Sequence, residues 1–231
     1  SDKYDHAMKD LAKYLGFNKN NLFVEGYDVS HHSGKYAVAS CVKFSNQGPD
    51  KNAYKLYNID PLYAGNDVGS IQHVLERRVQ KTSQNPLPDI ILIDGGQAQL
   101  NAALSAFRVK NSVKPILLSI VKGAKRVRST ETILSEQGIL EIPVNSPGFN
   151  LLQQVRDESH RFAIKNNRKK KQLSIKKSKL NSIFGIGPAK KKLILKRFKS
   201  IGNIKQSNVQ DLANIPGIGL KLAELIKSSL D

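Results

Sequence analysis

Two aspartates occupy positions where the surrounding sequence is otherwise apolar. Asp28 lies within the apolar and aromatic stretch Leu22–Val29, and Asp94 ends the apolar run Ile90–Ile93, directly before two glycines. A charged side chain inside an apolar strand is costly unless another group compensates for it. Carboxylates at the ends of adjacent strands are hard oxygen ligands for Mg²⁺ or Mn²⁺, ions that activate water and neutralise phosphate charge. The two aspartates are therefore candidates for metal-dependent phosphodiester chemistry.

Simpler interpretations of these residues remain open on the sequence alone. Asp28 could be a hydrogen-bonded strand residue, and Asp94 could cap a turn or the next helix. His160 lies on a predicted helix with Arg156 and Asp157 close by on the helical wheel, a spacing more typical of a solvated histidine. The pattern of residues does not decide which acidic groups converge on one site.

A short glycine-containing motif occurs twice near the C-terminus. Phe184–Lys190 resembles Pro216–Leu222, and each copy follows a short helical stretch and opens another helix. Glycine provides the backbone freedom that such a turn needs, and successive N–H groups at a helix N-terminus attract an anion. A pair of such hairpins can hold the backbone of both strands of a DNA duplex with little sequence preference, although two such turns could also simply pack helices together. The residues expected to contact DNA here are Gly185, Gly187, Lys190, Lys191, Gly217, Gly219 and Lys221.

The charge balance indicates a polyanionic partner. The 231 residues contain 37 Lys and Arg against 19 Asp and Glu, a net charge of +18, and the stretch between Ser159 and Gln210 contains no acidic residue. Such a block repels itself unless it meets a polyanion, and binding to a phosphate backbone gains affinity from the release of condensed counterions. A solvated basic linker is the alternative. Lys122 and Arg126, which follow a predicted strand, could also contact phosphate or belong to a solvated loop.

Composition narrows the class of protein further. A hydrophobic content of 39% supports a folded core, no window approaches the roughly 18 apolar residues of a membrane helix, and the polar N-terminus has no signal-peptide core. Cys41 is the only cysteine, which excludes an intrachain disulfide and a cysteine-based zinc cluster. We therefore expect a cytoplasmic protein with neither a membrane partner nor a small-molecule cofactor.

Apolar periodicity predicts three antiparallel strands followed by alternating strands and helices. The predicted strands are Leu22–Val29, Tyr36–Phe44, Ala53–Ile59, Asp89–Ile93 and Pro115–Val121, with a hairpin over Thr132–Ile142. The predicted helices are Asp5–Leu15, Val68–Val79, Gln97–Phe107 and Gly148 to about Arg168. This order indicates an α/β fold, a mixed sheet with flanking helices, over residues 1–168. A basic linker is expected at 169–179 and a small all-helical domain at 180–231.

Several of these segments together resemble one family. They are Gly26–His31 with Gly34, Ala39–Val42, Tyr57–Ile59, Ile91–Gln97 with Gln99–Leu100, Lys122–Gly123, Glu131–Thr132 and Leu152–Ala163. The tandem hairpins follow in the family's order, and Arg156–Ala163 is a very specific string. From about residue 22 on, the chain resembles the C-terminal half of the UvrC subunit of the bacterial UvrABC excinuclease.

The resemblance implies an RNase H-like endonuclease domain with a divalent metal, Mg²⁺ or Mn²⁺, followed by a tandem helix-hairpin-helix domain. Carried over by motif, the active-site set of the family is Asp28, Asp94 and His160. The two aspartates are implied as metal ligands, and His160 as a ligand or as a general acid or base. The implied activity is incision on the 5′ side of a bulky lesion in double-stranded DNA, in a complex with the UvrB helicase subunit after UvrA has loaded it.

The sequence departs from the family in three places. The family's N-terminal GIY-YIG nuclease and its UvrB-contacting region have no counterpart here, so we expect this chain alone to lack 3′ incision and to bind UvrB poorly. Gly65-Asn66-Asp67 stands where the family usually has Gly-Asp-Asp. Asn66 replaces the first of these two aspartates, so any role of that aspartate is not carried over. Phe184 replaces the more usual proline at the first hairpin.

Two other functions fit the same residues. One is a free-standing, structure-selective nuclease of the same fold, such as a junction resolvase, which acts as a symmetric dimer without a helicase. The other is a non-catalytic DNA-binding adaptor that kept the fold. An intact set of Asp28, Asp94 and His160 favours a nuclease over an adaptor, because a decayed domain would be expected to lose one of the three.

Overall fold

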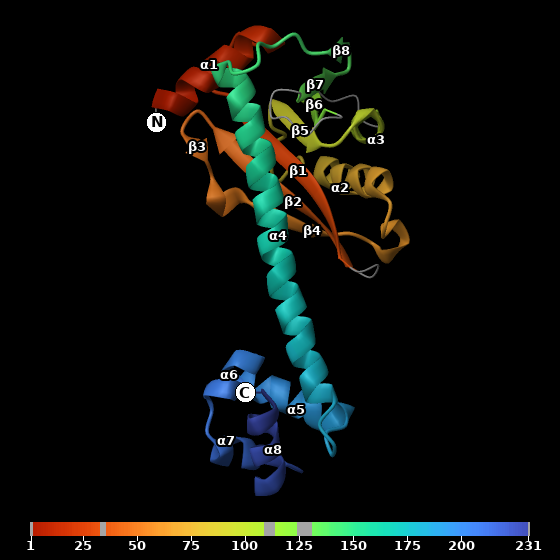
Figure 1. Ribbon diagram of the computed structural model, residues 1–231, viewed down its shortest axis with the longest axis vertical. Coiled ribbons are helices and arrows are strands. Elements are labelled where there is room, and N and C mark those ends of the chain that lie inside the picture. The colour runs from red at the N-terminus through yellow and green to blue at the C-terminus, as the bar shows by residue number, and fades with distance from the viewer. Residues whose placement is uncertain (1, 33–35, 109–113, 124–130, 231) are drawn as a thin grey trace. The chain divides into compact units, whose positions relative to one another are not determined.

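The computed structural model describes residues 2–32, 36–108, 114–123 and 131–230 (Figure 1). Its helices are α1 (Asp2–Leu15), α2 (Asp67–Gln80), α3 (Gln97–Phe107), α4 (Pro147–Asn181), α5 (Pro188–Phe198), α6 (Ile201–Gln206), α7 (Val209–Ala213) and α8 (Leu220–Leu230), with 3-10 turns η1 (Lys51–Ala53) and η2 (Pro61–Tyr63). Its strands are β1 (Val24–His32), β2 (Tyr36–Ser45), β3 (Gly48–Pro49), β4 (Lys55–Asn58), β5 (Ile90–Asp94), β6 (Ile116–Val121), β7 (Thr132–Ser135) and β8 (Gly138–Ile139). Within these ranges no helix is long and apolar enough to cross a membrane.

The strands of the described chain form one mixed sheet in the order β3-β2-β1-β5-β6-β7-β8, with β4 paired to β2. β1 pairs antiparallel with β2 but parallel with β5, and β5 pairs parallel with β6. Parallel neighbours need a crossover connection, which includes α2 between β1 and β5 and α3 between β5 and β6. The predicted α/β arrangement, an antiparallel group followed by alternating strands and helices, is therefore confirmed.

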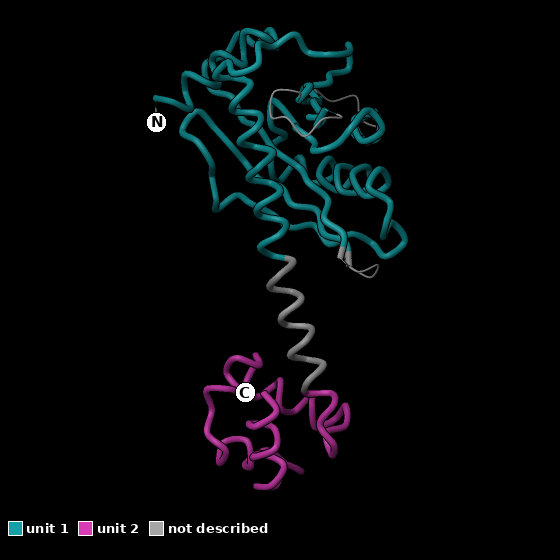
Figure 2. Tube along the Cα trace, viewed as in Figure 1, with its two compact units in different colours: residues 1–167 teal, residues 168–231 magenta. Residues whose placement is uncertain are grey.

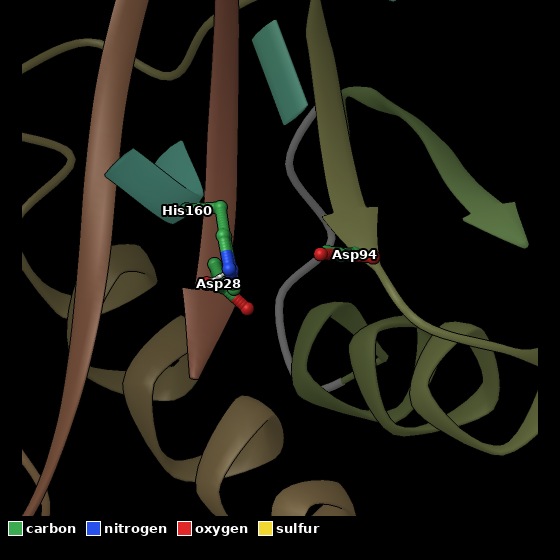
Figure 3. A group of neighbouring side chains, drawn as sticks. All are labelled: Asp28, Asp94 and His160. Atoms are coloured by element: carbon green, nitrogen blue, oxygen red, sulfur yellow. Dashed lines mark hydrogen bonds and ion pairs between the residues drawn. The ribbon is translucent and has the colours of Figure 1, made fainter. Parts of the chain in front are cut away.

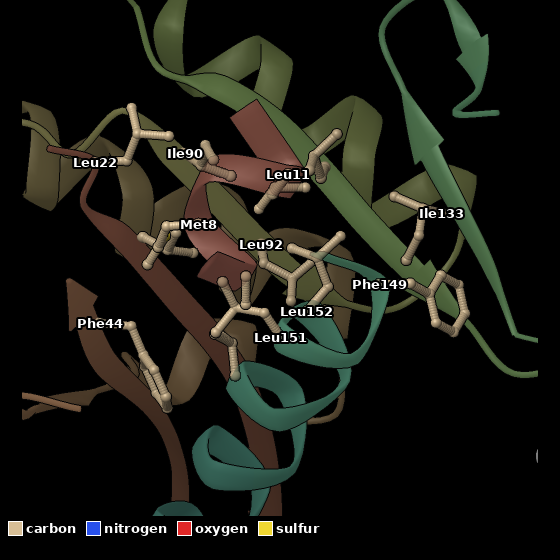
Figure 4. Close-up of a cluster of buried hydrophobic side chains, with 14 of the residues drawn as sticks. Met8, Leu11, Leu22, Phe44, Ile90, Leu92, Ile133, Phe149, Leu151 and Leu152 are labelled. Atoms are coloured by element: carbon tan, nitrogen blue, oxygen red, sulfur yellow. The ribbon is translucent and has the colours of Figure 1, made fainter. Parts of the chain in front are cut away.

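Both faces of the central strand β5 are covered. Ile90 and Leu92 pack in one cluster with side chains of α1 and α4, whereas Ile91 and Ile93 pack in another with side chains of α2 and α3. Figure 4 shows the first cluster, in which side chains of α1 and α4 lie against the strands. A strand that is buried on both faces is apolar almost throughout, which explains the apolar run that precedes Asp94.

The helix α4 extends beyond its expected end near Arg168. It continues to Asn181, so residues 169–179, which we expected to form a linker, are helical. This basic segment contains neither glycine nor proline, the two residues that disfavour a helix most. Contacts divide the chain into two compact units at this helix, residues 1–167 and 168–231 (Figure 2).

The second unit is helical in its described part and has its own core. Its buried residues are Leu180, Ile183, Ile186, Ile194, Ile201, Ile204, Leu212, Ile215, Ile218, Ala223, Ile226 and Leu230. Each glycine-containing hairpin places two isoleucines in this core, Ile183 and Ile186 in the first copy and Ile215 and Ile218 in the second. The two copies of the motif are thus anchored in the same small core.

Gly26 of β1 allows α4 to lie close to the sheet. A Cβ atom at this position would lie 2.5 Å from Cγ1 of Val155 and 3.3 Å from the carbonyl oxygen of the same residue. The first distance is far shorter than an ordinary carbon–carbon contact, which is about 3.5–4.0 Å. Any larger residue at Gly26 must therefore displace the side chain of Val155 or the helix that carries it.

We expect Gly26→Ala to lower the free energy of unfolding by about 1–3 kcal/mol, because the added methyl group overpacks this contact. Val155→Ala removes the nearest clashing atom, so the double variant should lose less stability than the sum of the two single variants. Tyrosine fluorescence during urea unfolding reports on the first unit alone, since all 7 tyrosines precede residue 168. Strictly additive losses would contradict the close approach of α4.

Candidate metal centre

The register of the sheet places Asp28 and Asp94 side by side. The last registered pair of the parallel strands β1 and β5 is Tyr27 with Ile93, so the two aspartates are the next residues along their strands. Side chains alternate between the faces of a sheet, which directs both aspartates to the face that also carries Leu92 and is covered by α4. Figure 3 shows the two residues on adjacent strands, Asp28 within β1 and Asp94 at the end of β5.

The helix α4 brings His160 to the same face of the sheet. Val155 packs into the core cluster, and His160 lies five residues later, at the margin of the sheet-facing side of the helix. The hydroxyl of Ser40 in β2 donates a hydrogen bond to the carbonyl oxygen of Ser159 over 2.7 Å, and both of these serines are buried. This bond ties α4 to the sheet directly beside the histidine.

Asp28, Asp94 and His160 converge on one point. Each offers a ligand atom, and these atoms all lie within 4.8 Å of one another. Nδ1 of His160 lies 2.9 Å from Oδ2 of Asp28 (Figure 3). The side chain of Asp28 is 10% exposed and that of His160 is 58% exposed, so the site has a buried floor and an open side. These three residues could hold a metal ion.

Burial makes both carboxyl groups harder to ionise. It raises the pKa of Asp28, and the nearby charge of Asp94 raises that pKa further, against a hydrogen bond from His160 that lowers it. Burial also raises the pKa of Asp94, against the positive charges of Lys122 and Arg156, which lower it. A divalent cation would favour the ionised form of both groups, because it supplies the positive charge that two neighbouring carboxylates lack.

Arg156 and Glu131 belong to the surroundings of the site, although the spacing of residues assigned them no role. Arg156 lies one helical turn before His160 and forms ion pairs with Glu131 and with Asp157, the latter over 2.7 Å. Nε2 of Gln153 donates to the second oxygen of Glu131 over 2.7 Å. This network fixes a guanidinium near the aspartates. The signals for it in the sequence were two segments of the family resemblance, Glu131–Thr132 and the string that begins at Arg156.

The departure from the family pattern at Asn66 has a structural explanation. Oδ1 of Asn66 accepts a hydrogen bond from the N–H of Gly69 over 2.9 Å and thereby caps α2. Asparagine caps a helix about as well as aspartate does, so the exchange preserves the cap. The next residue, Asp67, pairs with Nε2 of His31 at the end of β1. Within the described ranges, Asp67 is not part of the group that could hold an ion.

Basic residues were expected near the edge of the sheet that carries Asp94. Lys122 follows β6 and is exposed, and its charge lowers the pKa of Asp94, so it lies on this side of the domain. Arg126 lies outside the described residues. A contact of either residue with DNA stays a prediction.

The two hairpin turns of the second unit have the same backbone geometry. The N–H of Ile186 donates to the carbonyl of Ile183 over 3.2 Å, and that of Ile218 donates to Ile215 over 3.0 Å. The third residue of each turn is a glycine with positive φ, +90° at Gly185 and +82° at the equivalent position of the second turn. Both are therefore type II turns, which require this left-handed conformation.

The two turns also lie against each other's helices. A Cβ atom at Gly185 would lie 3.6 Å from Cδ1 of Leu222 in α8, and one at Gly217 would lie 3.4 Å from Cε of Lys190 in α5. Lys190 and Leu222 occupy equivalent positions in the two copies, so the contacts are reciprocal. The repeat in the sequence thus corresponds to an approximate two-fold repeat in space.

The expected DNA-contacting lysines of this unit differ in their surroundings. Nζ of Lys190 donates to the carbonyl of Gly185 over 3.1 Å, and Nζ of Lys191 contacts the side chain of Asn181. Lys221, at the start of α8, is exposed. All three positive charges lie within the first turn of a helix that begins directly after a hairpin.

Comparisons with known proteins match the two units of the chain to two different families. Residues 12–164 match the family described as UvrC RNAse H endonuclease domain, and residues 177–231 match the SAM-like helix-hairpin-helix tandem. Together these matches confirm the predicted fold class, an RNase H-like α/β domain followed by a small helical tandem.

Curated relatives match nearly the whole chain. It is 37% identical over 224 residues to UvrABC system protein C of Pseudomonas syringae pv. syringae (strain B728a) and 38% identical to that of Pseudomonas fluorescens (strain SBW25). Each match covers 95% of this chain but 37% of the relative, so the chain spans little more than a third of their length. Among solved structures, the catalytic domain of human Endonuclease V is 13% identical, with a TM-score of 0.42, over 72% of this chain and 96% of that chain.

The raised pKa of Asp94 predicts how its removal affects the metal-free protein. A carboxyl group whose pKa is higher in the folded state disfavours folding once it ionises, so it costs stability as the pH rises above the ordinary value of 3.8. In the presence of a chelator, Asp94→Asn should raise the melting temperature at pH 7, and the difference should shrink as the pH falls below that value. Each kcal/mol relieved corresponds to about 2–4 °C in a chain of this size.

A carboxyl group whose pKa is lowered instead of raised provides the control, because its removal should change stability in the opposite direction. An ion pair with Arg161 lowers the pKa of Glu158, so Glu158→Gln should reduce stability at pH 7 and lose its effect in acid. Melting curves from pH 3 to pH 8 measure both variants. A lower melting temperature of Asp94→Asn at pH 7 would show that the aspartate does not experience the described electrostatic environment.

Proposed function

Because the chain belongs to the UvrC family, we propose that it is the metal-dependent endonuclease module that makes the 5′ incision beside a bulky lesion during nucleotide excision repair. The observation that carries this proposal is the convergence of Asp28, Asp94 and His160 to within 4.8 Å. The two aspartates come from different strands and the histidine from a helix far away in the sequence, so the fold brings them together. We further propose that the module works in the cytoplasm.

The donor set supports Mg²⁺ or Mn²⁺ as the ion. Carboxylate oxygens are the ligands that these ions prefer, and an imidazole nitrogen is also suitable for Mn²⁺. When bound, such an ion supplies an activated water and neutralises charge on the phosphate. Asp28 and Asp94 would hold it, because the burial that raises the pKa of both carboxyl groups and the charge of Asp94 beside Asp28 favour a bound cation.

The contact between His160 and Asp28 supports a role in proton transfer. A neutral imidazole whose Nδ1–H donates to Oδ2 of Asp28 keeps the lone pair of Nε2 free. The partly exposed ring can then accept a proton from a water molecule at Nε2, while Asp28 fixes the tautomer and the orientation of the ring. His160 is thus the general base in this proposal, and Asp28 acts both on the ion and on the histidine.

The hairpin glycines support DNA binding by the second unit. Gly187 and Gly219 directly precede α5 and α8, and a Cβ atom at either position would meet no atom within 4 Å. Gly187 has a φ of −86°, which other residues adopt readily. The fold itself therefore does not require glycine at these positions, whereas the close approach of a phosphate to the backbone N–H groups does.

We propose that partner proteins bring this module to its substrate. The substrate is double-stranded DNA with a lesion or an unwound region. We propose that UvrB holds the opened DNA after UvrA has loaded it, and that the basic second unit keeps the adjacent duplex close to the first. Such binding should weaken steeply with salt, because each neutralised phosphate releases counterions.

Nicking of a lesion-containing bubble duplex in Mn²⁺, with and without UvrB, tests the proposal. The unaltered chain should cut on the 5′ side of the lesion. Asp94→Asn should remove this activity, and His160→Ala should slow it by about 10²–10⁴-fold, the usual contribution of a general base. Asp50→Asn, an exposed aspartate before η1 that makes no capping hydrogen bond, is the matched control and should cut normally.

The outcomes separate the possible functions. Cleavage that occurs only with UvrB would mean that the partner gates the site. Undiminished cleavage by Asp94→Asn would contradict the proposed metal centre. DNA binding without cleavage, even with UvrB present, would leave either a non-catalytic adaptor or a chain that cannot engage UvrB by itself.

A further inference from the structure

Phe184 is almost completely exposed at the tip of the first hairpin. Its exposed fraction is 94%, the highest among the large apolar side chains that the structure describes. The neighbouring residues Ile183 and Ile186 are buried in the core of the second unit, whereas Phe184 is not among the residues that pack on this core. The ring therefore contributes nothing to the packing of the described part of this unit.

The turn itself does not favour phenylalanine at this position. Phe184 is the second residue of a type II turn, the position at which proline is preferred because its fixed φ matches the turn. The second hairpin has Pro216 at the equivalent place. A single exposed apolar side chain is common on protein surfaces, but this one replaces the residue that suits the turn best and lies in the element proposed to touch DNA.

The sequence that follows Phe184 is strongly positive. Lys190, Lys191 and Lys192 lie in the first turn and a half of α5, and no acidic residue occurs between Ser159 and Gln210. Exposed aromatic rings within a positively charged surface are the combination that binds unpaired nucleotides, because the charges hold the backbone and the ring stacks on a base.

The distances along the chain allow both contacts at once. Phe184 precedes Gly187 by three residues, a span of at most roughly 10 Å. Successive nucleotides of one strand advance by about 3.4 Å in duplex DNA. A phosphate held at the start of α5 therefore leaves the ring within reach of bases a few nucleotides away along the same strand.

We propose that Phe184 stacks on an unpaired base and so directs the first hairpin to the boundary between duplex and unwound DNA. In an intact duplex both faces of each base are covered by its neighbours, whereas an unwound region offers open faces. The second hairpin, with Pro216, holds only the backbone of the duplex. The asymmetry between the two turns then orients the tandem on the DNA. This inference rests on the proposed DNA-binding function of the second unit.

Fluorescence anisotropy of the full chain tests the proposal with two probes of equal length, a perfect duplex and a duplex with a central unpaired bubble that contains 2-aminopurine. We expect the unaltered chain to prefer the bubble. Phe184→Pro, which copies the second turn, and Phe184→Leu, which keeps an apolar side chain, should each lower the bubble-to-duplex affinity ratio about tenfold, or about 1.4 kcal/mol. Phe184→Tyr should keep the ratio and the change in 2-aminopurine fluorescence.

Gly187→Ala is the matched control, because its methyl group has space in the protein but would obstruct a phosphate. It should weaken binding to both probes and leave their ratio unchanged. If Phe184→Pro and Phe184→Leu keep the ratio while Gly187→Ala weakens binding, the stacking proposal is overturned and DNA binding by the hairpins stands; a ring that serves a protein partner would give this result. If the unaltered chain binds neither probe, the proposed function of the second unit fails as well.

Discussion

The close packing of α4 on β1 is the constraint on which the candidate site depends. A helix contributes His160, and two strands contribute the aspartates, so the imidazole reaches Asp28 only when the helix lies low over the sheet. Gly26 provides the necessary space, since a single added carbon would lie 2.5 Å from Val155. The buried bond from Ser40 to Ser159 holds the helix at the same level. The close approach of α4 to the backbone of β1 thus makes possible the 2.9 Å contact between His160 and Asp28.

Side chains of β1 alternate between the two faces of the sheet, so the residues of the candidate site and a buried ion pair that stabilises the domain lie on opposite faces. Gly26 and Asp28 face α4, whereas Glu25 and Tyr27 face α2. On that second face Glu25 accepts hydrogen bonds from Arg78 over 2.9 and 3.0 Å and from the hydroxyl of Tyr27 over 2.7 Å. A buried carboxylate with a matched cation is electrically satisfied, and loss of either partner would leave a costly unpaired charge. Asp28 lies on the opposite face beside another carboxylate, and burial together with that neighbouring charge raises its pKa.

Much of the fold was predictable from the sequence, because its signals are local. The apolar run before Asp94 reflects a strand buried on both faces, and the repeated glycines reflect two turns with positive φ. The convergence of the site was predictable only through the resemblance, since no local pattern relates His160 to a strand more than a hundred residues away. The ion pair between Arg156 and Glu131 and the extension of α4 to Asn181 were not predicted. The first depends on tertiary contacts, and the second on a basic segment whose charge suggested a linker although its residues favour a helix.

The most direct test of the metal centre is anomalous diffraction from crystals of this chain soaked in Mn²⁺. The arrangement predicts one strong manganese peak about 2 Å from a carboxylate oxygen of Asp28 and from one of Asp94, on the side of the sheet where α4 carries His160. Asp94→Asn crystals treated in the same way should lose the peak. A peak that persists in this variant, or manganese bound only elsewhere on the protein, would contradict the view that these three residues form the active site.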